Sequence, residues 1–258
     1  MAMPLHTILL LIGAGIGAGL LSSIVGGAAV VSYPALLAAG LPPQIAVASN
    51  LLAIMPGTLL AAFADRTQLP PLNRAFVGMV FASIAGAAAG AVLLMLTPVR
   101  VFEVLVPILL GFATLVFAYA GKVSTWLKSR AKARGHHITF NITSLKMLLP
   151  VSFYGGYFGA GVGVLLLGVF TLATGGDYRS ANVTKNLVTS LNSMTAAAIF
   201  VVQGAVAWPQ ALTMMAGTVA GGLIGSYIAR MMPQHVMRIF VVAMGAVLTV
   251  AFAWRYWY

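Results

Sequence analysis

Residues 23–52, SIVGGAAVVSYPALLAAGLPPQIAVASNLL, have a counterpart in residues 159–188, GAGVGVLLLGVFTLATGGDYRSANVTKNLV. A shift of 136 positions aligns identical residues, among them Gly27 with Gly163, Gly40 with Gly176, Asn50 with Asn186, and Leu51 with Leu187. Each copy contains a glycine-flanked apolar segment of about fourteen residues, too short to cross a hydrocarbon core roughly 30 Å thick. Such segments at matching positions in two halves are typical of the broken or re-entrant helices of transporters. The two stretches therefore predict an internal duplication.

The sequence around this duplication is that of a polytopic membrane protein. The chain has 258 residues, of which 61% are hydrophobic and 7% are charged. Apolar runs long enough to cross a bilayer recur along it: Leu72–Leu96, Val101–Ala120, Ala207–Ala229 and Ile239–Trp254. The N-terminal MAMPLHTILLLIGAG lacks the basic region of a cleaved signal, so we expect the first mature helix to start at Leu5.

We predict an all-α polytopic membrane protein with two inverted repeats of about five helical segments each. Residues 1–120 form the first repeat, 121–144 a basic cytoplasmic loop, and 145–258 the second repeat. The predicted segments are Leu5–Val25, Gly27–Gly40, Gln44–Phe63, Leu72–Leu96, Val99–Ala120, Leu145–Gly161, Val162–Gly175, Ser180–Gln203, Ala207–Ala229 and Val236–Trp254. The glycine spacings Gly15–Gly19, Gly86–Gly90 and Gly217–Gly221 predict helices whose backbones pack closely.

The basic residues favour inversion of the two repeats. If all ten segments change sides and the central loop is cytoplasmic, 12 of the 14 lysines and arginines lie inside and 2 outside. If the short segments are fused to their neighbours, giving eight crossings, the split is 9 to 5. Because basic loop residues are retained in the cytoplasm, the first arrangement, with both termini outside, is favoured.

Composition also excludes several functions. The net charge of +11 is too scattered for a nucleic-acid-binding face. Without cysteine, the chain has no disulfides or thiolate metal sites. The three carboxylates, Asp65, Glu103 and Asp177, lie near predicted helix ends, and no catalytic pair or phosphate loop is recognisable. We therefore expect neither an enzyme nor a bound cofactor or metal; the expected partners are a small anion and the lipid bilayer, and the oligomeric state is left open.

The strongest polar signal is ANVTKNLVTSLNS, residues 181–193. On a helix Lys185, Thr189 and Asn192 share one face, at positions i, i+4 and i+7. A stripe of ammonium, hydroxyl and amide groups suits a small oxyanion that needs several donors. The alternative is that Lys185 snorkels to the membrane surface. We expect Arg179 and Asp177 at the cytoplasmic mouth, where Arg179 attracts anions or pairs with Asp177.

Alignment of the two halves assigns further residues to this candidate site. Ser49 and Asn50 occupy the positions of Lys185 and Asn186, which gives one fixed positive charge in the pair of repeats. The glycines at the short segments would present backbone amides at helix N-termini. The candidate substrate-binding residues are Ser22, Ser23, Gly26, Gly27, Ser49, Asn50, Tyr154, Tyr157, Gly161, Gly163, Lys185, Asn186, Thr189 and Asn192.

The order of these motifs resembles one family. GGAAVVSYPALLAAGLPPQIAVASN in the first half, with YGGYFGAGVGVLLLGVF and SANVTKN in the second, is similar to the TauE/SafE family of sulfite exporters and toluene-sulfonate permeases, over about Leu5–Trp254. The resemblance implies transport of sulfite, sulfoacetate or related sulfonates across a bacterial cytoplasmic membrane, often as export. It maps the family's glycine-rich elements onto Ser22–Gly27 and Gly155–Gly163, and its polar helix starts onto Ser49–Asn50 and Lys185–Asn186.

The function expected from these observations is export of a small sulfur oxyanion by alternating access. Two alternatives stay open at this point. One is a membrane protein that transports nothing and helps a neighbouring complex to assemble. The other is an importer of a different sulfur compound.

Overall fold

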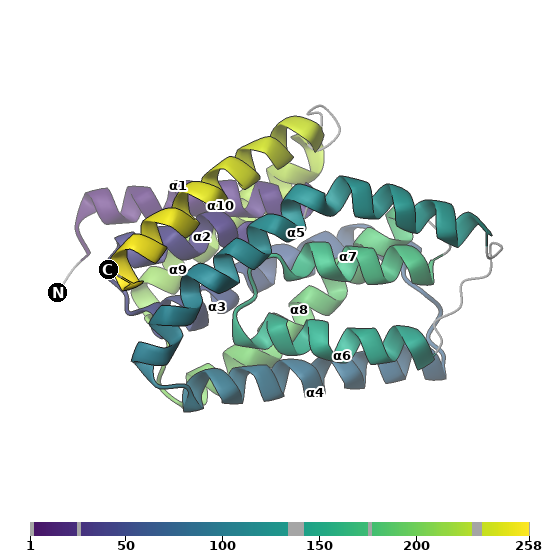
Figure 1. Cartoon of the computed structure of the whole chain (residues 1–258), viewed down its shortest axis with the longest axis horizontal. Coiled ribbons are helices and arrows are strands. Elements are labelled where there is room, and N and C mark those ends of the chain that lie inside the picture. Colours follow the sequence, from purple (N-terminus) through teal and green to yellow (C-terminus); the bar gives the residue numbers. More distant parts are fainter. Residues whose placement is uncertain (1–2, 25–26, 134–141, 175–176, 229–233, 258) are drawn as a thin grey trace.

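The computed structural model describes the whole chain except residues 1–2, 25–26, 134–141, 175–176, 229–233 and 258. The described residues form helices and no strands, as predicted (Figure 1). The first half contains α1 (Leu5–Ile24), α2 (Ala28–Ala38), α3 (Pro43–Ala64), the short 3-10 helix η1 (Arg66–Gln68), α4 (Arg74–Leu96) and α5 (Val99–Ala133). The second half contains α6 (Ile142–Tyr157), α7 (Val162–Ala173), α8 (Tyr178–Val202), α9 (Trp208–Ile228) and α10 (Gln234–Trp257).

Two predicted helix ends differ from the structure by four residues or more. Helix α5 continues past the predicted end at Ala120 to Ala133, so the first part of the predicted loop 121–144 is helical. The reason is that segment 121–133, GKVSTWLKSRAKA, is rich in strong helix formers and contains no proline. Helix α6 ends at Tyr157 instead of Gly161, because Gly159 and Gly161 have φ angles of 79° and 77°, which interrupt a right-handed helix.

Side-chain caps fix the starts of two helices. Asn73 accepts a hydrogen bond from the backbone N–H of Phe76 at 2.9 Å and so begins α4. Asp177 accepts from the backbone N–H of Arg179 at 3.0 Å and so begins α8. Asparagine and aspartate favour this position because their oxygens satisfy amides that have no partner within the helix.

The most extensive helix contacts join the two halves of the chain. Helix α1 packs on α9, and α4 packs on α6, so each pair takes one helix from each half (Figure 1). In both pairs, glycine lets the backbones touch: a Cβ on Gly19 would meet the backbone of Gly221, and a Cβ on Gly90 would meet that of Phe153. The close packing predicted from the glycine spacings is thus confirmed.

The equivalent helices of the two halves that pack together, α5 with α10 and α3 with α8, are antiparallel. In α5 and α10, Trp257 Nε1 donates to the backbone oxygen of Val104 at 3.2 Å, while a Cβ on Gly111 would lie 3.3 Å from Thr249. Helices α3 and α8 also cross with opposite directions, since Ser190 Oγ donates to Thr58 Oγ1 at 2.9 Å and Ala207 N, just beyond α8, donates to Ser49 Oγ at 3.0 Å. Antiparallel pairing of equivalent helices is compatible with the predicted inverted repeats.

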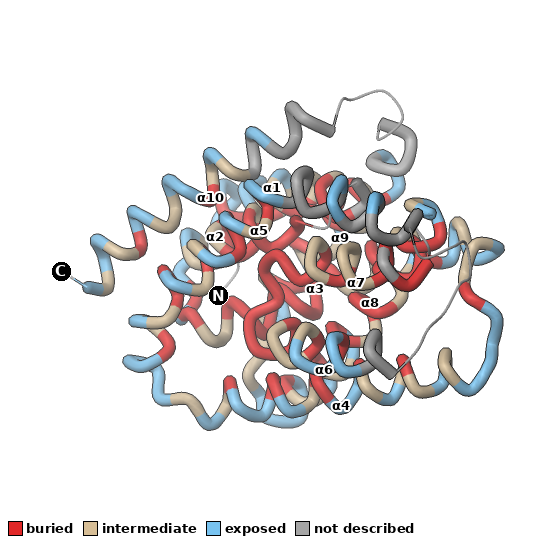
Figure 2. The backbone as a smooth tube through the Cα atoms, turned by 45° about the vertical axis from the view of Figure 1, so that its right-hand side comes forward, coloured by how far each residue is buried: buried red, intermediate tan, exposed pale blue. Residues whose placement is uncertain are grey.

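The burial pattern is that of a bundle immersed in lipid. Among the described residues, four helices are long and apolar enough to cross a membrane, within α1, α3, α4 and α5. Large apolar side chains are exposed on the outer helices, for example Phe81 and Trp254 at 69% and 74%, which water would not favour over so wide a surface. Many of the buried residues lie in α3 and α8 at the centre (Figure 2). The protein is therefore a multi-pass membrane protein whose most polar helix, α8, is enclosed by apolar ones.

Candidate functional site

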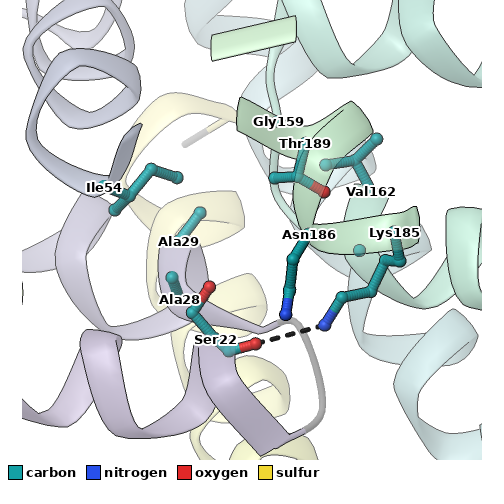
Figure 3. A pocket seen from close by; sticks show the side chains of 10 residues that line it. Ser22, Ala28, Ala29, Ile54, Gly159, Val162, Lys185, Asn186 and Thr189 are labelled. Atoms are coloured by element: carbon teal, nitrogen blue, oxygen red, sulfur yellow. Dashed lines mark hydrogen bonds between the residues drawn. The ribbon is translucent and has the colours of Figure 1, made fainter. Parts of the chain in front are cut away.

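A small cavity lies where the broken segments of both halves meet the central helices. It is lined by Ser22, Ala28, Ala29, Ile54, Gly159, Val162, Gly163, Lys185, Asn186 and Thr189 (Figure 3). Its space is enough for roughly one water molecule. Five of the ten lining residues, Ser22, Gly163, Lys185, Asn186 and Thr189, are among the candidates from the sequence.

Lys185 supplies the cavity with a cation. Its side chain is 1% exposed, and Nζ donates to the backbone oxygen of Ser22 at 3.2 Å, in the last turn of α1 (Figure 3). The ammonium group therefore turns inward in this structure and does not reach the surface by snorkelling. All three carboxylates of the chain lie in its described part, and the one ion pair there joins Asp65 to Arg179. Lys185 thus has no carboxylate counter-charge.

The first turns of two short helices face the same cavity. Ala28 and Ala29 begin α2, and Val162 and Gly163 begin α7. The amides of a first helical turn have no acceptor within the helix, and they carry the positive end of the helix dipole. Left-handed Gly159 and Gly161 make the sharp turn that separates α6 from α7. The cavity is therefore surrounded by an ammonium group and two helix N-termini, all of which favour an anion.

Two further polar side chains of α8 line the cavity without a complete set of partners. The hydroxyl of Thr189 and the amide oxygen of Asn186 are buried and have no hydrogen-bond partner among the described residues. Figure 3 shows Asn186 and Lys185 extending toward the same end of the cavity, near Ser22. Buried polar groups are normally paired, so these groups are suited to a small polar ligand.

The remaining candidates on the central helices lie elsewhere. Ser49 is fully buried and accepts the backbone N–H of Ala207, so it holds the connection between α8 and α9. Asn50 is also fully buried, but it does not line the cavity, and neither its Nδ2 nor its Oδ1 has a hydrogen-bond partner in the part of the chain that the structure describes. Asn192 accepts a hydrogen bond from Ser83 on α4 and lies behind the cavity wall, against Gly155.

The two candidate tyrosines make structural contacts outside the cavity. Tyr154 donates from its hydroxyl to the backbone oxygen of Ala160 at 2.7 Å and so supports the glycine turn after α6. Tyr157 packs edge-on against Phe102, with ring centroids 5.8 Å apart, and its hydroxyl lies 3.4 Å from that of Thr97. Neither lines the cavity.

The candidates at the helix breaks have different positions. Gly27 is buried against the ring of Phe117, which leaves no room for a Cβ, and Gly161 precedes the first residue of α7. Gly26 and the side chain of Ser23 lie outside the described residues. Sequence reasoning missed Ala28, Ala29, Ile54, Gly159 and Val162, because apolar residues and glycine carry no chemical signal. Ala28, Ala29 and Val162 could have been predicted only from their positions, because each lies just after a predicted helix break.

Comparison with known proteins gives a consistent result. The family model described as "Sulfite exporter TauE/SafE" matches residues 11–252. The chain is 25% identical over 236 residues to a "Probable membrane transporter protein" of Haemophilus influenzae, covering 91% of this chain and 90% of the relative. It is 31% identical over 226 residues to "Probable membrane transporter protein ORF9" of Sinorhizobium sp, covering 86% and 82%.

A third relative is "Probable membrane transporter protein YfcA" of Escherichia coli K12, which is 26% identical over 235 residues, covering 90% of this chain and 84% of the relative. No solved structure matches the chain significantly. The names of the relatives describe membrane transport and specify no substrate.

Proposed function

Because the chain belongs to the sulfite exporter TauE/SafE family, and is thus a membrane transporter, we propose that it exports a small sulfur oxyanion by alternating access. The proposed cargo is sulfite, sulfoacetate or a related organosulfonate. The proposed binding residues are the five candidates from the sequence that line the cavity: Ser22, Gly163, Lys185, Asn186 and Thr189.

One observation supports this proposal most directly. Lys185 is buried without a carboxylate partner, beside two helix N-termini. A buried cation is costly unless an anion compensates it. A small oxyanion would provide the missing charge and would accept hydrogen bonds from Lys185, from Thr189 and from the amides that begin α2 and α7.

Export is the favoured direction for energetic reasons. One negative charge that leaves a cell with a negative interior gains about 2.3 kcal/mol per 100 mV of membrane potential. Import would need a coupling ion, and the three carboxylates that could bind a proton or sodium do not line the cavity. Asp65 and Asp177 lie at helix ends, and Glu103 is on α5.

The proposal is tested by radiolabelled sulfite efflux from proteoliposomes. Lys185→Gln removes the charge and is expected to lower efflux about 10- to 100-fold, the loss typical of a hydrogen bond to a charged group. Lys185→Arg retains the charge and should retain part of the flux. Lys146→Gln, which changes an exposed lysine on α6, is the matched control and should behave as wild type.

A ligand screen by thermal shift complements the flux assay. Sulfite, sulfoacetate, taurine, sulfate and thiosulfate are compared on purified wild type and Lys185→Gln, since a ligand that binds the folded state raises the melting temperature. Stabilisation of wild type alone by one of these anions supports the proposal. If none binds wild type and none is transported, a non-transporting assembly role becomes the better explanation.

A further inference from the structure

Protein groups compensate the charge of Lys185 only partly. An ammonium group has three N–H donors, and the structure gives Lys185 one acceptor among the described residues, the Ser22 oxygen at 3.2 Å. That oxygen belongs to the carbonyl end of α1, which carries a partial negative charge. One carbonyl replaces only part of the hydration that an ammonium group loses when it becomes 1% exposed.

The other groups at the cavity add to its positive potential. The N-termini of α2 and α7 face it with partial positive charges. Asp65 is occupied by Arg179 at 2.8 Å, and Asp177 is exposed and caps α8. The protein groups around the cavity therefore form a buried positive region, and a bound anion would remove most of that excess charge.

This difference between the empty and the loaded site determines how the carrier returns. In alternating access the site must pass from one side of the membrane to the other both with cargo and after its release. A charge buried in a membrane protein raises the energy of the state that contains it, whereas in the loaded site Lys185 and the partial positive charges of two helix N-termini offset most of the charge of the anion. The barrier should therefore be higher for the empty carrier than for the loaded one.

We propose that the protein is an anion exchanger, which releases its sulfur oxyanion outside and returns with a small inorganic oxyanion bound to Lys185. This inference rests on the proposed function and adds a second ligand to it. A divalent anion that leaves in exchange for a monovalent one still moves net negative charge outward.

The lining of the cavity specifies the class of the returning anion. Lys185 and Thr189 supply donors from α8, and the first residues of α2 and α7 line the cavity from the short helices. Such a set binds an oxyanion with several acceptor atoms better than it binds a halide. The apolar wall of Ala28, Ala29, Ile54 and Val162 leaves little room, so the smallest of these oxyanions, such as sulfite and sulfate, are favoured over organosulfonates in both directions.

The experiment compares efflux with and without an anion on the opposite side. Proteoliposomes are loaded with radiolabelled sulfite, the membrane potential is held at zero with potassium and valinomycin, and the external solution contains gluconate, chloride, sulfate or unlabelled sulfite. We expect external sulfite and sulfate to accelerate efflux about tenfold or more over gluconate. A small difference between the barriers for return with and without a bound anion is enough to produce this factor. Chloride should accelerate it less.

Variants at two lysines link this acceleration to the buried charge. Lys185→Arg keeps the charge and should keep the acceleration, as should the exposed control Lys146→Gln. In Lys185→Gln the residual efflux at saturating sulfite should no longer depend on the external anion, because its empty site carries no ammonium group.

The possible failures are distinguishable. Wild-type efflux that is equally fast in gluconate and in sulfate would overturn exchange and leave the proposed function intact. Net efflux that is fast and accompanied by proton movement would also overturn it, since the carrier would then return empty after losing a proton. Absence of sulfite movement in every external solution would reject the proposed function itself.

Discussion

Arg179 Nη2 lies 2.8 Å from Asp65 Oδ1 and joins the first turn of α8 to the residue that follows α3. The sequence had suggested that Arg179 attracts anions or pairs with Asp177. Instead Asp177 accepts the backbone N–H of Arg179, and the guanidinium group crosses to the other half of the chain.

Loss of this ion pair should change stability only slightly. The side chains of Arg179 and Asp65 are 62% and 43% exposed. Water therefore solvates both charges when the pair is broken, and the pair contributes little to the free energy of unfolding. Asp65→Asn is expected to lower the melting temperature a little at low salt and not at all at high salt, where screening weakens the pair. The double charge reversal Asp65→Arg with Arg179→Asp should restore the low-salt value. A large, salt-independent loss would contradict this view.

The glycine contact between α4 and α6 should be essential for packing. In Gly90→Ala the new Cβ meets the backbone of Phe153 and lies 2.8 Å from Tyr157 N, so the helices must separate. Overpacking of this kind costs about 1–3 kcal/mol, and we expect a lower melting temperature. Gly13→Ala is the matched control on α1, where nothing lies within 4 Å of the new Cβ. Since alanine favours helix more than glycine does, this variant should be as stable as wild type or slightly more stable.

The turn before α7 should control anion affinity. Gly159→Ala places a Cβ at a φ of 79° and 2.8 Å from Leu51 Cδ2, so it should displace the start of α7 from the cavity. Gly204→Ala has the same kind of backbone strain, with a φ of 67°, in open space after α8. Both variants should lose about 1 kcal/mol of stability. Only Gly159→Ala should also weaken stabilisation by sulfite in a thermal-shift titration, and equal sulfite responses would argue against this role.

The hydroxyl of Thr189, which has no partner among the described residues, should contribute to ligand affinity and not to the stability of the protein. Thr189→Val keeps the shape of the side chain and removes a buried hydroxyl without a protein partner. The apo protein should therefore be no less stable, while sulfite should bind about tenfold more weakly or worse, as expected for a lost hydrogen bond to a charged group. Thr184→Val is the control on the same helix, because its hydroxyl donates to the oxygen of Ser180 at 2.7 Å and does not line the cavity. Weaker sulfite binding in Thr184→Val as well would point to a general effect on α8.

The helices were largely predictable, because glycine and proline mark most of their ends. The short segments before and after the central loop became α2 and α7, close to their predicted limits. The end of α5 was not predictable from hydropathy, since a helix can leave the membrane and continue through residues such as those of segment 121–133. The end of α6 depends on the left-handed φ of Gly159, which glycine permits but does not require.

The lining of the cavity was predictable where it carries polar side chains of α8 and not where it depends on helix crossing. Lys185 and Thr189 were predicted from their helical spacing, and both line the cavity. Ser49 and Asn50 were placed at the site by the repeat alignment, but the crossing of α3 over α8 directs Ile54 to the cavity and Ser49 to Ala207. Identical positions in two repeats share a fold and need not share a ligand.

The close pairs α1 with α9 and α4 with α6 limit how this bundle can open. Each pair binds a helix of one half to a helix of the other, with backbones in contact at Gly19 and Gly90. A rocking motion that moved the two halves apart as rigid bodies would have to break both of these helix contacts. Movement that leaves them intact must instead occur between the α1–α9 pair and the α4–α6 pair.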